Sequence, residues 1–343
     1  MGILCQINLF KPPDGVFTAG STIQGLIKYG VDEVTVFDKI TVSLKGQGNL
    51  VVEEQHEKNN STYSEKEVYI DDDVIVTNEK GIAHEIGMYQ TRFDFQLPDN
   101  IPSSFHYRGR NTSFIVRCDI IYYVRIKFER PGFLQFTKRF KKELTVVSKL
   151  KPTLPTEPTI YGEQKKLFQL FSSKRNIVDL KANIRKSVIP TGGEIELDCE
   201  VTNDTDVIIK GIEVKLVETH KFKTSAKDVT FNKDVADTDT KTGSIKNDET
   251  KIHDIVINVP TDASTLGFSK IASRIYTVRI TAQLPFPHIN AVLDIPVEIG
   301  DLIRDSDVVE DVNEDTPSDY ENPPPYWVAM GEMTNKEEFY SEK

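Results

Sequence analysis

Apolar and polar residues alternate with a period of two along much of this chain. Residues 38–48 place Ile40 and Val42 between polar side chains, and residues 192–201 show the same pattern. Such alternation is typical of a β-strand that has one face against a core and the other in solvent. The best helical candidate, residues 163–174, is short and lacks a capping residue. The pattern therefore predicts an all-β protein.

The strand pattern also repeats within the chain. Sliding the sequence along itself until Gly20 meets Gly192 superimposes turn glycines and apolar strand positions without a gap. The matched pairs at this one offset include Ile23/Ile195, Ile40/Ile212 and Leu44/Leu216. Farther along, the sequence IYYVRI at residues 121–126 matches IYTVRI at 275–280. Two copies of one β-sandwich unit explain this repeat.

The repeat predicts how the chain is divided. We expect two tandem immunoglobulin-like β-sandwiches, over residues 1–150 and 151–300, followed by a tail over residues 301–343. Residues 149–159 contain three prolines, which cannot donate hydrogen bonds to a sheet, so this segment is the expected linker. Gly132 follows Pro131 and predicts the turn of a hairpin.

Charge is concentrated in the tail. The chain has 343 residues and a formal net charge of −11, and residues 301–319 hold eight acidic side chains against one arginine. A segment with so much like charge and so few apolar groups cannot bury enough surface to fold, so we expect it to be disordered. The overall negative charge argues against a nucleic-acid partner.

Residues for catalysis or metal binding do not form a known pattern. The three cysteines, Cys5, Cys118 and Cys199, are far apart and form no CxxC pair, and residues 84–88 (HEIGM) lack the second histidine of HExxH. Cys199 shares the apolar face of its strand, which predicts an inert, buried thiol. We therefore expect a protein without catalytic residues, metal or cofactor, located in the reducing cytoplasm.

The sequence ENPPPYW at residues 321–327 stands out in the acidic tail. The consecutive prolines favour a polyproline II helix, and WW domains bind such helices between aromatic rings. In a PPxY motif Pro323 and Pro324 would fill the aromatic groove, and Tyr326 would enter a second pocket. The alternative interpretation is a stiff linker whose aromatic residues are incidental.

Longer stretches resemble a known family. Residues 7–48 are similar to the start of the arrestin N-terminal domain, and residues 184–218 and 255–284 are similar to the arrestin C-terminal domain. The proline–tyrosine motif extends the resemblance to the α-arrestins, the arrestin domain-containing proteins. The resemblance implies two seven-stranded sandwiches and an adaptor that links membrane cargo to WW-domain HECT-type ubiquitin ligases. The chain departs from the family in having one PPxY motif and no clathrin box at residues 302–306.

A second candidate site is basic. Residues 123–142 are predicted to form a hairpin, and its cations could contact phosphorylated or acidic cargo tails or acidic lipid head groups. The candidate residues are Arg125, Lys127, Lys138, Arg139, Lys141 and Lys142. The alternative interpretation is the solvated face of a strand pair.

The resulting functional hypothesis is a cytosolic adaptor that promotes ubiquitination, endocytosis and trafficking of membrane receptors or transporters. Its recruitment to the plasma membrane or endosomes, with peripheral membrane association, would follow from that role. Two alternatives remain open. One is a constitutive coat or sorting subunit resembling the arrestin-fold subunit of retromer, which would need no PPxY motif, and the other is a receptor-desensitising arrestin.

Overall fold

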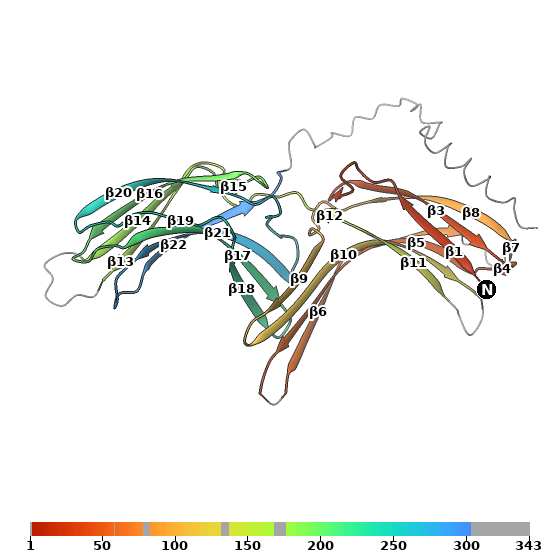
Figure 1. Cartoon of the computed structure of the whole chain (residues 1–343). Coiled ribbons are helices and arrows are strands. Elements are labelled where there is room, and N and C mark those ends of the chain that lie inside the picture. Colours follow the sequence, from red (N-terminus) through yellow and green to blue (C-terminus); the bar gives the residue numbers. More distant parts are fainter. Residues whose placement is uncertain (1, 58, 78–82, 132–136, 168–175, 303–343) are drawn as a thin grey trace, which may run out of the picture. The chain divides into compact units, whose positions relative to one another are not determined.

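A computed structural model describes residues 2–57, 59–77, 83–131, 137–167 and 176–302. The described residues form β-strands joined by turns and loops (Figure 1). This confirms the predicted all-β class. The predicted turn at Gly132 and the tail beyond residue 302 lie outside the described residues.

The first sandwich consists of two main antiparallel sheets. One has the strand order β1-β3-β8, and the other has the order β11-β10-β5-β6, with β9 also paired to β10. The main strands are β1 (Ile3–Leu9), β3 (Thr22–Val31), β5 (Lys39–Glu54), β6 (Ser61–Thr77), β8 (Gly87–Gln96), β9 (Phe105–Arg110), β10 (Phe114–Glu129) and β11 (Lys138–Leu144). Two-residue strands complete it as the pairs β2 (Phe17–Thr18) with β12 (Val146–Val147) and β4 (Thr35–Val36) with β7 (Ala83–His84).

The second sandwich has a related topology, with the additional edge strand β13 in its first sheet. Its sheets have the orders β13-β14-β16-β20 and β15-β22-β21-β17-β18, with β19 also paired to β17. The strands are β13 (Thr159–Lys166), β14 (Ile177–Ile184), β15 (Val188–Ile189), β16 (Glu194–Asp204), β17 (Gly211–Lys223), β18 (Asp228–Asp234), β19 (Thr240–Lys241), β20 (Glu249–Asn258), β21 (Ala272–Gln283) and β22 (Ala291–Ile299).

The internal repeat predicted from the sequence is confirmed by the strand positions. Strands β5 and β17 begin at Lys39 and Gly211, which are separated by the same offset as Gly20 and Gly192. Each of these strands pairs with the strand that carries the matching IYxVRI sequence. The preceding turn glycines, Gly20 and Gly192, both adopt positive φ angles of 83° and 70°. Both turns therefore use a conformation that favours glycine over residues with a β-carbon.

Alternation produces the two cores. On β5 the side chains of Ile40, Val42 and Leu44 are completely buried. Thr41 and Ser43 between them point to the opposite face, which is also buried here and not solvated as the pattern predicts. The second sandwich has its own core, in which Cys199 is also completely buried as predicted. The first core continues into the second sandwich, because five buried residues from it belong to the same apolar cluster. These are Phe222, Val229, Leu266, Ile271 and Ala272.

The structure also describes part of the helical candidate, and the predicted linker. Residues 163–166 of the best helical candidate belong to strand β13, in agreement with the predicted all-β fold. Pairing with β14 supplies backbone hydrogen bonds that a short uncapped helix lacks. In the predicted linker, Leu150 pairs with Leu302, and the Thr153 backbone amide donates to the Glu298 carboxylate at 2.9 Å. The domain boundaries at residues 150 and 300 stay predictions.

Candidate binding sites

The predicted WW-binding residues, Pro323, Pro324 and Tyr326, lie outside the described residues. Their assignment therefore continues to rest on the sequence PPPY and on its distance from the second sandwich. Glu298 and Asp301, near the end of that sandwich, bond to residues of the predicted linker, so the chain leaves the described body at a point that is anchored to it.

The predicted basic hairpin consists of strands β10 and β11. Antiparallel pairing places Arg125 opposite Lys141 and Lys127 opposite Arg139. Residues directly opposite each other lie on the same face of a sheet, so these four cations share the outer face. Strand β11 is at the edge of its sheet, and its charged side chains are exposed.

Carboxylates neutralise part of this surface. Lys127 forms an ion pair with Glu129, and Lys141 forms one with Glu143 at 2.8 Å. The hydrogen bond from Lys141 to Glu143 also raises the pKa of the lysine. Both partners are two residues away along the same strand, so they point to the same face. These ion pairs lower the cationic character that a count of lysines and arginines alone would suggest.

The remaining cations divide into two kinds. Half-buried Arg125 donates to the Ser43 hydroxyl at 3.4 Å, whereas its Nε has no partner among the described residues. Lys138, Arg139 and Lys142 are exposed and form no ion pair within the described part of the chain. We call these three residues the β11 cationic strip. Alternation along this edge strand places Arg139 on the outer face and Lys138 and Lys142 on the opposite face. They are the part of the predicted basic site that can accept an external anion.

A second charged region joins the two sandwiches, and sequence reasoning missed it. The Glu67 carboxylate on β6 accepts hydrogen bonds from the Ser269 hydroxyl at 3.0 Å and the Lys270 backbone amide at 2.8 Å. Nearby, Glu65 accepts from the Ser225 amide at 2.9 Å. No local pattern could have identified these contacts, because the partners are at least 160 residues apart in sequence.

An ion pair extends this junction. Lys227 donates to Glu54 at 2.7 Å, and the Tyr63 hydroxyl donates to the other oxygen of the same carboxylate at 3.2 Å. The bond from Lys227 lowers the pKa of Glu54. The first sandwich therefore presents three carboxylates, and the second presents amide, hydroxyl and ammonium donors to them.

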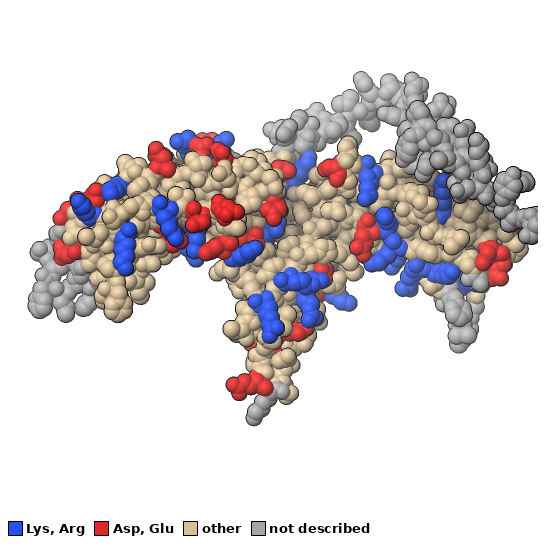
Figure 2. Space-filling view, in the orientation of Figure 1, with Lys and Arg blue, Asp and Glu red and all other residues tan. Residues whose placement is uncertain are grey.

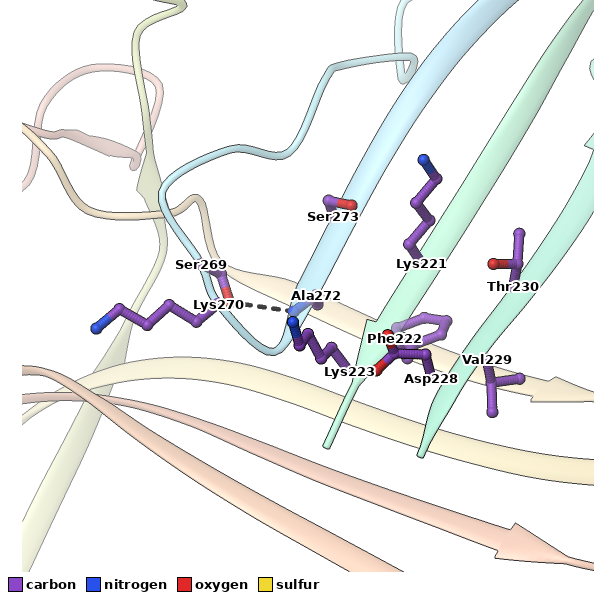
Figure 3. Close-up of a pocket in the computed structure, with 10 residues that line it drawn as sticks. All are labelled: Lys221, Phe222, Lys223, Asp228, Val229, Thr230, Ser269, Lys270, Ala272 and Ser273. Carbon is purple, nitrogen blue, oxygen red and sulfur yellow. Dashed lines mark hydrogen bonds between the residues drawn. The ribbon is translucent and has the colours of Figure 1, made fainter. Parts of the chain in front are cut away.

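A lysine-rich pocket adjoins the Glu67 contact (Figure 3). It has a volume of about 250 Å³, and strand pairing places Lys221 between Ser273 and Thr230. The loop at its rim is held by the bond from the Ala272 amide to the Ser269 hydroxyl at 3.3 Å. Figure 3 shows Lys270 extending away from the strands, so the ammonium groups of Lys221 and Lys270 do not converge on one point.

Charges of both signs are interspersed over the face of the molecule in Figure 2. Among the described residues, no group of three or more histidine, cysteine, aspartate or glutamate side chains could hold a metal ion. Within the same residues, no helix has the length and apolar character needed to cross a membrane.

Comparison with known proteins agrees with the observed topology. Residues 5–152 match the model of the arrestin (or S-antigen) N-terminal domain, and residues 174–302 match that of the arrestin (or S-antigen) C-terminal domain. The two matches cover most of the chain in the order that is typical of an arrestin. The chain therefore belongs to the arrestin family.

A curated relative makes the assignment more specific. The chain is 22% identical over 227 residues to arrestin domain-containing protein 5 of Homo sapiens. The aligned region covers 62% of this chain and 61% of that protein, which is less than two thirds of the relative's length. The resemblance to the α-arrestins, the arrestin domain-containing proteins, is thereby confirmed.

Proposed function

We propose that this protein is an adaptor whose sandwiches bind membrane cargo and whose PPPY sequence recruits a WW-domain HECT-type ubiquitin ligase. Membership in the arrestin family supports the adaptor role. The observation that carries the ligase link is the sequence Pro323-Pro324-Pro325-Tyr326 placed after two arrestin domains. The expected consequence is ubiquitination of the cargo, followed by its endocytosis or sorting at the plasma membrane or endosomes.

The chemistry of the motif fits this role. The proline ring restricts φ to the range of a polyproline II helix, so the segment loses less conformational entropy on binding than an ordinary peptide does. The Tyr326 ring supplies apolar area, and its hydroxyl can form a hydrogen bond at the pocket rim. A single motif of this kind should bind at roughly micromolar affinity, or about −8 kcal/mol.

The proposed cargo-binding surface is the β11 cationic strip. Lys138, Arg139 and Lys142 are exposed and have no ionic partner among the described residues. Cations of this kind form strong hydrogen bonds with carboxylates and phosphates. We therefore propose phosphorylated or acidic cytoplasmic tails of receptors or transporters as its ligands, with acidic lipid head groups as the alternative source of the same charge.

Cargo binding and ligase binding would cooperate because they belong to different parts of one chain. The segment that follows Asp301 and ends at Pro323 connects the second sandwich to the motif. A chain of that length with random-coil statistics spans about 25 Å. Attachment through such a segment would raise the local concentration of the ligase beside bound cargo without any new contact.

Truncation before residue 320 tests this proposal. The shortened protein should fold and bind cargo, whereas cargo ubiquitination and removal from the cell surface should be lost. Cells that express the full-length chain at the same level serve as the control. Unchanged cargo ubiquitination after truncation would contradict the ligase-adaptor function and would favour a constitutive coat-like subunit.

A further inference from the structure

We propose that a cavity between β9 and the β17–β18 hairpin binds the phosphate groups of a small molecule, which would join the two sandwiches. The cavity has a volume of about 500 Å³ and is lined by residues of both sandwiches. Ligand pockets for small molecules usually have volumes of about 300–1,000 Å³. Basic side chains gather in Figure 2 over the region where Figure 1 shows β9 and β18.

The lining is strongly cationic. It contains the side chains of Arg108, Arg110, Lys233 and Arg274, against the single carboxylate of Glu218. Two of the arginines are already held in position, since Arg108 donates to Asp119 at 2.8 Å and Arg274 donates to the Ser264 hydroxyl at 2.6 Å.

The side chains of the other two cations, Arg110 and Lys233, are available to bind an anion. Within the described part of the chain, neither Arg110 nor Lys233 forms a hydrogen bond or ion pair through its side chain, and both are exposed. Arg110 comes from the first sandwich and Lys233 from the second. An anion in the cavity would therefore bring two unpaired cations together across the junction, and phosphate offers several strong acceptor oxygens for this purpose.

A buried histidine supplies an independent observation. His220 is only 5% exposed and lines the cavity, and its Nε2 contacts the Glu218 carboxylate. Its Nδ1 is buried and has no hydrogen-bond partner among the described residues. Because Nε2 faces a carboxylate, Nδ1 would carry a proton only in the imidazolium form. An anion at Nδ1 would complete the hydrogen bonding of that form.

Charged groups of both signs surround His220. Glu218 on the same strand and the Tyr276 hydroxyl, which donates to Glu218 at 2.9 Å, lie on one side. Burial would raise the pKa of Glu218, but the hydrogen bond from His220 lowers it overall, so this carboxylate stays ionised at neutral pH.

Cations on the neighbouring strands also face this cavity. Arg108 on β9, Lys233 on β18 and Arg274 on β21 line the same cavity, so their positive charges repel one another. The aromatic neighbours add no charge at neutral pH, and the nearest is Tyr107, whose ring centre lies 4.5 Å from that of His220. A bound anion would offset the repulsion between the cations.

The first test measures anion binding to the full-length chain. Tripolyphosphate is titrated at constant ionic strength and pH 7.5, and the heat of binding and the thermal unfolding midpoint are recorded. The double variant Arg110→Gln/Lys233→Gln should bind about tenfold or more weakly than the wild type. Lys28→Gln/Lys166→Gln is a matched control that removes the same charge from exposed positions outside the cavity. Equal weakening of both variants, or no saturable binding by the wild type, would overturn the proposal.

The second test concerns His220. His220→Gln should bind tripolyphosphate more weakly than the wild type at pH 7.5, because its amide can bond to Glu218 but offers no second ring nitrogen to the anion. Equal affinities of the wild type and His220→Gln would overturn the role of His220. A nucleoside triphosphate, titrated in parallel, distinguishes the two sources of phosphate: tighter binding than tripolyphosphate indicates an organic phosphate packed on Tyr107, and equal binding indicates that the phosphate chain is sufficient.

Discussion

Tyr69 in the first sandwich and Ser269 in the second are joined by a hydrogen bond of 2.9 Å between their hydroxyl groups. Both hydroxyls also lie 3.0 Å from the same oxygen of Glu67. Burial raises the pKa of Tyr69, so its hydroxyl stays protonated throughout the physiological pH range. This triad connects residues that are 200 positions apart in sequence and makes the junction of the two sandwiches specific.

Replacing Tyr69 with phenylalanine should weaken this junction. The change removes one hydroxyl and leaves Ser269 with fewer partners, so the free energy of unfolding should fall by about 1 kcal/mol. Urea denaturation measures the effect. Tyr89→Phe is the matched control, because among the described residues the Tyr89 hydroxyl bonds to the exposed Glu85 carbonyl alone. Equal stabilities for Tyr69→Phe and the wild type would show that the triad contributes nothing.

Alanine at either turn glycine should destabilise the fold. Gly20 and Gly192 have positive φ angles, and a residue with a β-carbon in this region costs roughly 1–2 kcal/mol. The loss should be larger at Gly20, because an added β-carbon there would overlap the Asp99 carboxylate oxygen, whereas one at Gly192 would lie 3.0 Å from the Thr261 methyl group. Gly87→Ala is the control, since no atom lies within 4 Å of its added β-carbon and its φ is not positive. A control that loses as much stability as the turn variants would refute the role of φ.

Thiol ionisation should make the fold less stable in alkaline solution. Burial raises the pKa of both Cys118 and Cys199 to about 12, whereas an unfolded thiol ionises near pH 8.5. The folded state therefore binds protons that the unfolded state has lost, and the resulting stability, complete below pH ~8.5, is lost as the pH rises toward 12. Urea denaturation between pH 8 and 10.5 should show a smaller loss for Cys118→Ala/Cys199→Ala. Parallel curves for the variant and the wild type would contradict this.

The strands and the internal repeat could be predicted because period-two alternation is a local property. Ile40, Val42 and Leu44 are completely buried, as the pattern indicates, and Cys199 follows its apolar neighbours into the second core. Contacts between the sandwiches could not be predicted in this way. Glu67 and Ser269 are polar residues on strand or loop surfaces, and nothing near either one in the sequence specifies the other.

The basic hairpin shows a different limit. Its cations were identified by composition, yet Lys127 and Lys141 are paired with Glu129 and Glu143 on the same face. Both carboxylates are two residues from their lysines, so strand periodicity contained this information. Counting charge by face rather than by segment would have grouped each of these lysines with its carboxylate.

Loss of the β11 cationic strip should weaken cargo binding more than loss of the paired lysines. The variant Lys138→Gln/Arg139→Gln/Lys142→Gln removes charges that have no ionic partner among the described residues. We expect at least about fivefold weaker binding to a phosphorylated cytoplasmic tail peptide. Lys127→Gln/Lys141→Gln is the control on the same strand pair, and fluorescence anisotropy measures both affinities. A larger loss in the control would remove the strip from the cargo-binding surface.

Titration of the full-length chain with WW domains of HECT-type ligases tests the central claim most directly. Tyr326→Ala removes the ring that would enter the second pocket, so the affinity should fall at least about tenfold, or roughly 1.4 kcal/mol. Pro324→Ala should have a similar effect, whereas Trp327→Ala, outside the PPxY motif, should change the affinity less. Equal affinities of the wild type and Tyr326→Ala would contradict the account of this protein as a ligase adaptor.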